Sequence, residues 1–139
     1  MKRIICLTLV LTLLSAMHAS GQETLNEDEK SSVYAFGVCS SLIDSVIVMT
    51  EIQQLDCRLN KAGFMLNEQS YSKQLTRHIT GGQQFSDKFS TIFYETSLKK
   101  IKKERSKLLN KYKKKKKEYA VKTLSKDEFL FKEVQEEQY

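Results

Sequence analysis

Two apolar segments near the start of the folded region predict a pair of strands. Residues 33–40 and 46–53 are rich in β-branched and aromatic side chains, which favour strands. Residues 41–45 lie between them, and Asp44 and Ser45 are turn-forming types, so a hairpin is expected. Because both strands are apolar on both faces near the turn, the pair should be central in a sheet. Gly37 inside the first strand indicates a bulge or a close backbone neighbour.

The next segment changes to helical spacing. Tyr71, Leu75 and Ile79 recur at intervals of four, which predicts a helix over 68–79. Asn67 is a candidate cap for its start, and Gly81-Gly82 is typical of a helix end. Residues 56–67 show no clean period, so they are expected to form a loop that contains a short strand or turn at 64–66.

A strand followed by a long basic helix is the most distinctive pattern. Residues 89–95 predict a buried strand, and Thr96 or Ser97 is a candidate cap for a helix over 97–118. Six apolar residues fall on one arc of that helix, which should pack on the sheet: Leu98, Ile101, Leu108, Leu109, Tyr112 and Tyr119. Arg105 and Lys116 share the arc, so their stems should lie along it with their charged heads in water.

The remaining pattern completes the fold class. Residues 120–124 predict a strand and residues 125–128 predict a turn. Phe129 and Phe131 alternate with Leu130 and Lys132, which predicts a last edge strand. The order strand, strand, helix, strand, helix, strand predicts a small two-layer α+β domain. Its mixed sheet should have four to five strands, with the long basic helix and the short helix packed on one face.

The N-terminal segment of the chain suggests export. Residues 1–21 have a basic start, an apolar core at 4–14 and a small polar end, as in a secretory signal peptide. Ala19 and Gly21 place the cleavage before Gln22. The expected organisation is then a flexible acidic leader at 22–32, a single domain at 33–134 and an acidic tail at 135–139. The expected location is the periplasm, the cell surface or the extracellular space, with no transmembrane segment in the mature chain.

Charge is concentrated on the predicted basic helix. The whole chain carries a formal net charge of +6, although eleven lysines lie between 97 and 118. Such a face attracts polyanions, although charge runs also serve solubility. Because lysine lacks the planar fork of arginine, no specific nucleic-acid recognition is expected. The candidate binding residues are Lys99, Lys103, Lys107, Lys111, Lys113, Lys114, Lys115, Lys116 and Lys117.

Candidate chemistry elsewhere is sparse. His78 is the only histidine after the predicted cleavage and has no ligand-spaced partner, so neither a metal nor another cofactor is predicted. Cys39 and Cys57 would be too far apart along the hairpin to form a disulfide unless the chain turned back sharply after Gln53. The sequence contains no nucleotide-binding, zinc-protease or nucleophile-elbow motif.

Several short segments resemble those of small uncharacterised exported proteins of Bacteroidota. They are residues 33–38, Asp44-Ser45, 50–53, Tyr71-Ser72, Gln74-Leu75, the strand with its lysine helix, Asp127-Glu128-Phe129 and Phe131. The resemblance covers most of the predicted mature chain. It implies an export signal, a small α/β domain and a role in the cell envelope, and it supplies no catalytic residues.

Three functions compete on this evidence. The first is a non-catalytic envelope or secreted binding domain, which predicts an exposed apolar patch on the sheet face away from the helices. Its expected partner is an envelope protein or an acidic surface. The second is non-specific polyanion binding through residues 97–118, with lipid head groups, acidic glycans or nucleic acid as ligands. The third is an enzyme, for which Glu51, Asp56 and His78 have no supporting spacing, so no catalysis is predicted.

Overall fold

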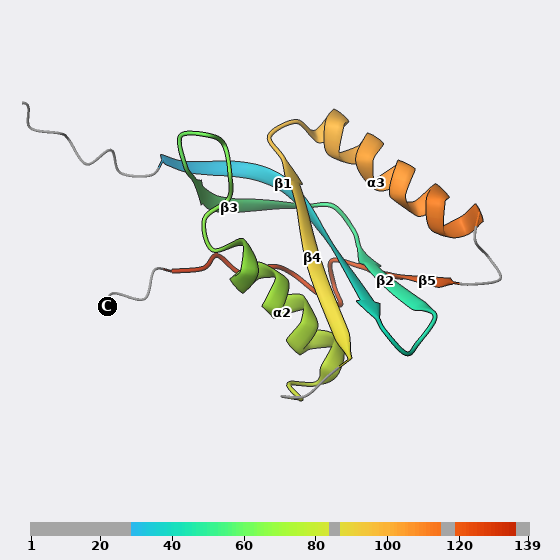
Figure 1. Ribbon diagram of the computed structural model, residues 1–139. Helices are drawn as coiled ribbons and strands as arrows, with labels where there is room; N and C mark the ends of the chain where they lie inside the picture. The colour runs from blue at the N-terminus through green and yellow to red at the C-terminus, as the bar shows by residue number, and fades with distance from the viewer. Residues whose placement is uncertain (1–28, 84–86, 115–118, 136–139) are drawn as a thin grey trace, which may run out of the picture.

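The computed structural model describes residues 29–83, 87–114 and 119–135 (Figure 1). Its elements follow the order β1 (Glu29–Ser41), β2 (Val46–Thr50), β3 (Gln53–Leu59), α2 (Glu68–Thr80), β4 (Lys88–Glu95), α3 (Leu98–Lys114) and β5 (Ala120–Leu124). The predicted α+β class with two helices is therefore confirmed.

Strand β1 is the centre of a mixed sheet. Tyr34 and Ala35 pair with β4 on one edge of β1 and with β3 on the other. Both pairings are antiparallel. Further along β1, Val38 and Cys39 pair with β2, again antiparallel. Strand β5 then runs parallel to β2. The described sheet has five strands, and β3, β4 and β5 each pair with a single strand.

Strands β2 and β3 follow one edge of β1 with a bulge between them. Ala35 pairs with Gln53 and Val38 with Met49, so three residues at 50–52 oppose two on β1. The predicted strand over 46–53 is therefore corrected to two strands. Opposite the bulge, the backbone N–H of Gly37 donates to Thr50 Oγ1 at 2.9 Å.

The bulge expected at Gly37 is found on the facing strands, and the close neighbour of this glycine is a side chain and not the backbone. Gly37 lies opposite the bulge, and a Cβ at this position would be only 2.5 Å from Cδ2 of Leu75 in α2. Since the shortest normal carbon–carbon contact is about 3.5 Å, the hydrogen side chain is what allows α2 to approach β1. The glycine thus serves helix packing.

Strand β3 corrects the loop expected over 56–67. Gln53, Leu55 and Cys57 are buried and alternate with exposed Gln54 and Asp56, which is the period of a strand. The polar buried residue at 53 masked this alternation in the sequence. Met65 forms an isolated bridge with Leu59, so the short strand or turn predicted at 64–66 is confirmed.

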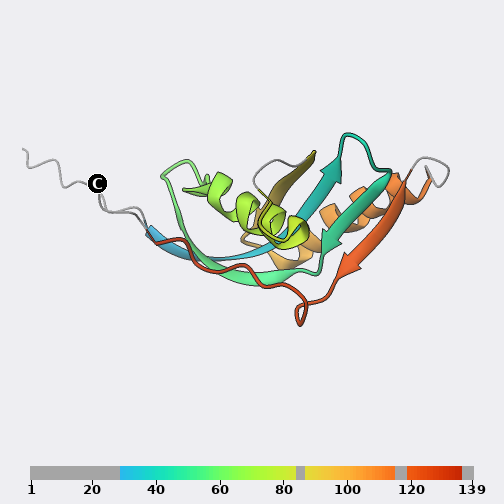
Figure 2. The ribbon, with the colours of Figure 1, turned by 90° about the horizontal axis from the view of Figure 1, so that it is seen from below.

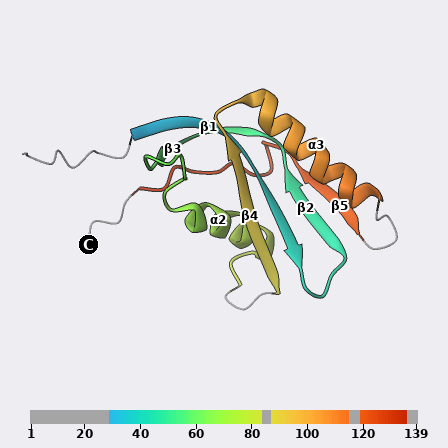
Figure 3. The same cartoon turned by 45° about the horizontal axis from the view of Figure 1, so that its top comes forward.

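The two helices pack against opposite faces of the sheet, which corrects their predicted placement on one face. Tyr71 and Leu75 of α2 share a core with Val33 and Ala35 of β1. Ile101 of α3 shares a second core with Phe36 and Val38. Because successive strand side chains point to opposite faces, these odd and even positions of β1 face different helices. In Figures 1 and 3, β1 and β4 run between the helices.

The short helix agrees closely with its predicted bounds. It ends at Gly81, whose φ of 62° is the left-handed conformation that glycine adopts easily. Asn67 occupies the cap position at the start, but its side chain makes no cap hydrogen bond. Instead, its carbonyl accepts the N–H of Ser70 at 2.8 Å.

The segment after β5 is not the predicted edge strand. Residues 129–135 have no strand assignment, and two glutamine side chains bind their backbone instead. Gln53 donates to the Phe129 carbonyl and accepts the Phe131 N–H, both at 2.9 Å. Gln74 of α2 makes the same paired contact with the backbone of Lys132. Figure 2 shows the segment following the curve of β1 and β3.

The boundaries of the domain extend the predicted ones. β1 begins at Glu29, inside the leader expected at 22–32, because its first residues pair with β3 (Ser31 with Cys57, Ser32 with Asp56). Lys30 also forms an ion pair of 2.9 Å with Glu133. The predicted signal peptide at 1–21, the leader residues 22–28 and tail residues 136–139 lie outside the described residues.

Candidate polyanion-binding face

A few apolar residues anchor α3 to the sheet. Ile101 is fully buried, and Leu108, Leu109 and Tyr112 pack partly buried against the same core, which confirms these four positions of the predicted apolar arc. Leu98 is instead 37% exposed, and Tyr119 packs against this core from outside the helix. Ser97 precedes the helix, and its hydroxyl accepts a long hydrogen bond of 3.5 Å from the Lys100 N–H. The helix is therefore fixed to the sheet along one side only.

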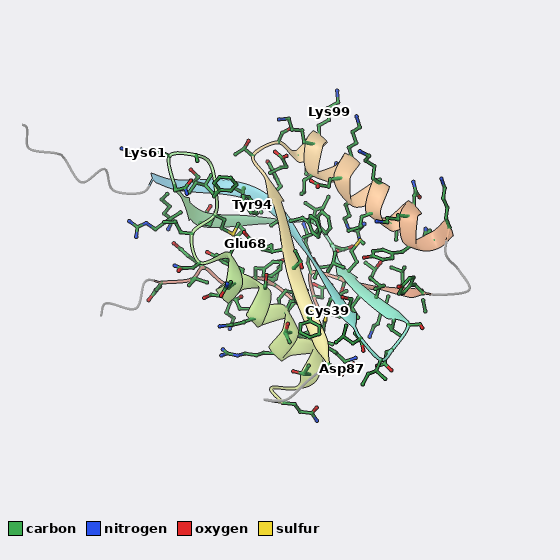
Figure 4. The ribbon with its side chains drawn as sticks, viewed as in Figure 1. Cys39, Lys61, Glu68, Asp87, Tyr94 and Lys99 are labelled. Carbon is green, nitrogen blue, oxygen red and sulfur yellow. The ribbon has the colours of Figure 1, made fainter. Side chains whose placement is uncertain are left out.

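The lysine side of α3 is open to solvent. Of the nine candidate residues, Lys99, Lys103, Lys107, Lys111, Lys113 and Lys114 are exposed, while Lys115, Lys116 and Lys117 lie outside the described residues. Figure 4 shows Lys99 pointing away from the sheet at the start of α3. Within the described part of the chain, none of these lysines forms an ion pair. We define these six exposed residues as the lysine face.

The charges of α3 repel one another. The helix has eight lysines and Arg105 but a single acidic residue, Glu104. Lys99, Lys103, Lys107 and Lys111 follow at intervals of four, where like charges are neighbours and each pair costs a few tenths of a kcal/mol. An anion bound along the face would relieve this repulsion. The arrangement therefore favours ligands with several negative charges.

Arg105 contacts the sheet from within the apolar arc. The residue is half-buried, and its Nε donates to the Thr50 carbonyl at 2.9 Å, at the bulge between β2 and β3. Burial lowers the pKa of this guanidinium from its usual value, and the negative charge of Glu51 opposes the shift. Arg105 thus positions α3 on the sheet and is not part of the lysine face.

A hollow of about 560 Å³ beside His78 is a second place, besides the lysine face, where charged groups gather. It is lined by cations and acids from α2 and from the turn after β5, among them Arg77, Lys126, Asp127 and Glu128. The Glu128 carboxylate accepts hydrogen bonds from the Ser125 N–H and the Ser125 hydroxyl. Both bonds lower the pKa of this carboxyl, and the backbone bond has the larger effect. The His78 ring contacts Phe129 at 5.0 Å between centroids. Since no hydrogen bond joins His78 to Ser125 or Glu128, these described side chains do not form a catalytic triad.

A second hollow of about 480 Å³ lies between α2 and β4. Its walls include Ser72, Thr76, Phe89 and Ser90. The hydroxyl of Thr76 donates to that of Ser90 at 2.8 Å, so the polar groups of the two elements satisfy each other. Among the described residues, no group of three or more His, Cys, Asp or Glu side chains could hold a metal ion.

The two described cysteines are free, as predicted, and both are buried. Cys57 pairs with Ser31 while Cys39 lies eight residues further along β1, roughly 26 Å away at the usual strand rise. Burial is the main cause that raises the pKa of the Cys57 thiol. A raised pKa keeps this cysteine as the unreactive thiol at neutral pH.

Exposed apolar side chains were the feature that sequence reasoning missed. No sheet face is left away from the helices, so the patch expected there is not found among the described residues. Instead, Leu42 and Ile43 at the tip of the β1–β2 hairpin are 80% and 82% exposed. The signal was present in the sequence, because two adjacent aliphatic residues are unusual in a turn of otherwise polar residues.

Comparisons with known proteins add no assignment. No protein-family model matches the chain, and neither curated proteins nor solved structures give a significant match. None of the described helices is both long and apolar enough to cross a membrane.

Proposed function

We propose that this protein is an exported, non-catalytic binding domain whose lysine face binds polyanions. The observation that supports this most strongly is the set of six exposed lysines on α3 that have no described acidic partner. Each desolvated contact between a lysine and a polyanion releases counterions from the polyanion. Binding of this kind is favourable, tolerant of ligand sequence and steeply dependent on salt.

Three ligand classes carry the required charge: lipid head groups, acidic glycans and nucleic acids. Bidentate contacts to base edges come mostly from arginine and from amide side chains. α3 has one arginine, which binds the Thr50 carbonyl, and one amide, Asn110. We therefore propose binding to charge density and not to nucleotide sequence. The export signal expected at 1–21 favours a ligand of the cell envelope.

Heparin provides a direct test because it is a polyanion without a bilayer. We expect the predicted mature protein to be retained on heparin at low salt and to elute as salt rises. Changing Lys99, Lys103, Lys107 and Lys111 to Gln should move elution to much lower salt and make the salt dependence shallower. Folding should be unchanged, since exposed charges contribute little to stability.

The matched control removes the same number of charges elsewhere. Lys61, Lys73, Lys126 and Lys132 are also exposed and lie off α3, so their change to Gln gives the same net charge. Elution of this control should stay close to that of the unmodified protein. Equal shifts in both variants would show that only net charge matters, and the lysine face would then serve solubility.

A further inference from the structure

The tip of the β1–β2 hairpin is built to hold two aliphatic side chains in solvent. The Ser41 hydroxyl accepts hydrogen bonds from the N–H groups of Ile43 and Asp44, at 3.0 and 2.8 Å. It also donates a hydrogen bond to the Asp87 carboxylate. The Leu42 N–H donates to the Asp87 carbonyl at 3.2 Å. With these polar groups satisfied inside the turn, Leu42 and Ile43 are left as its outermost side chains.

The ion pairing of the tip is also internal. Lys88 binds Asp44 at 3.2 Å, and hydrogen bonding from Ser41 is the main cause that lowers the pKa of Asp87. Both carboxylates are thus engaged within the hairpin and at the start of β4. Figure 4 shows Asp87 at that end of the strand. The tip thus presents Leu42 and Ile43, and the neighbouring carboxylates of Asp44 and Asp87 already have partners in Lys88 and Ser41.

The same end of the molecule carries the last turn of α3. Tyr112 of that turn contacts Tyr119 at 5.7 Å between ring centroids. The next residue, Ala120, donates its N–H to the Ser45 carbonyl at 2.8 Å, beside the hairpin tip. Lys111, Lys113 and Lys114 lie in this last turn. Aliphatic residues and a cluster of lysines therefore occupy one end of the domain (Figures 1 and 3).

This combination fits the surface of an anionic bilayer. Lysines are attracted to acidic head groups within about a Debye length of the surface. Aliphatic side chains gain free energy on entering the boundary between head groups and acyl chains. A soluble polyanion offers the first interaction but not the second. We infer that the domain binds anionic lipid bilayers, with Leu42 and Ile43 inserted and the last turn of α3 at the head groups. This inference rests on the proposed function and specifies its ligand.

The absence of tryptophan from the chain makes insertion directly measurable. Ile43→Trp would introduce the single tryptophan of the chain at the tip. On adding vesicles of phosphatidylglycerol and phosphatidylcholine, its emission should shift to the blue and be quenched by brominated acyl chains. Phe64→Trp is the matched control, because Phe64 is 64% exposed in the loop after β3. That loop adjoins the pairing of Leu59 with Glu29, at the end of β1 away from the hairpin tip. The emission of a tryptophan at position 64 should therefore not shift.

Removal of the apolar pair separates this inference from the proposed function. Leu42→Ser with Ile43→Ser should weaken co-sedimentation with anionic vesicles at physiological salt by about tenfold or more. The same variant should keep its heparin elution and its thermal unfolding transition, because both side chains are exposed. Pure phosphatidylcholine vesicles should bind neither protein, since the lysines then have no acidic head groups.

Three results would overturn the inference. They are equal vesicle binding by the double-serine variant, an unshifted Ile43→Trp spectrum, and a dimer that depends on Leu42 and Ile43 and excludes vesicles. If the unmodified protein binds heparin but not anionic vesicles, the inference fails while the proposed function stands. If it binds neither, both fail.

Discussion

Gly37 shows how one residue fixes the distance between a helix and the sheet. Its missing side chain leaves room for Leu75, and its N–H donates to Thr50 Oγ1 at the bulge. Thr50 is itself buried, and its carbonyl accepts Arg105 from the helix on the other face. The three contacts connect α2, the bulge and α3 through two neighbouring positions of the sheet. A change at residue 37 should therefore affect the whole core.

Gly37→Ala should lower the free energy of unfolding by about 1–3 kcal/mol, because its Cβ would overlap with Leu75. Urea denaturation of the predicted mature chain measures this effect. In a Leu75→Ala background only the Phe131 ring remains close to the added methyl, at 3.0 Å, so the same change should cost less. Equal costs in the two backgrounds would show that the overlap with Leu75 is not the cause.

At the scale of elements, side-chain amides replace a strand. The backbone of residues 129–132 would need a neighbouring strand to pair, and Gln53 and Gln74 supply the donors and acceptors in its place. This arrangement lets Phe129 and Phe131 bury their rings in the core of the α2 face. It also explains why a glutamine occupies a buried position of β3. The closing segment depends on two polar residues far away in the sequence.

Gln53→Leu should lower stability by about 1–3 kcal/mol, because it leaves the Phe129 carbonyl and the Phe131 N–H without partners. Gln54→Leu is the control on the same strand, since Gln54 is exposed and its side chain donates to the exposed Ser32 hydroxyl. It should change stability by less than about 0.5 kcal/mol. Similar costs for the two substitutions would contradict the role assigned to Gln53.

In the described part of the molecule, helices α2 and α3 differ in position and in charge. α2 and the closing segment cover one face of β1, while α3 covers the other and exposes its lysines. Both cores depend on β1, since it alone among the described strands pairs with three others. The proposed binding end is formed by the hairpin tip and the last turn of α3. Binding should therefore leave the two cores unchanged.

Export is expected to yield a chain that begins at Gln22, with Ala19 and Gly21 at the positions before the cut. Intact mass of protein recovered from the exported fraction measures the cleavage site. Cys6 should be removed with the signal, so alkylation after unfolding should modify two thiols, Cys39 and Cys57. Three modified thiols would show that the signal segment is retained.

Local patterns in the sequence determined the elements that lie in regular surroundings. The spacing of Tyr71 and Leu75 predicted α2, and the lysine helix and the strands before and after it were found close to their expected bounds. These patterns are readable because a helix or strand repeats its buried positions at a fixed interval. The separation of Cys39 and Cys57 likewise followed from the strand rise. The exposed lysines could be predicted because their positions avoid the apolar arc.

Tertiary contacts decided what no local period contains. β3 was hidden because a buried glutamine replaced the apolar residue that its alternation requires, and the partner of that glutamine lies 76 residues away. The face chosen by each helix depends on which residues of β1 it meets, and β1 is apolar on both sides. The grouping of the hairpin tip with the last turn of α3 depends on the parallel pairing of β2 with β5. Sequence periodicity records burial along one element, whereas these features depend on contacts between elements.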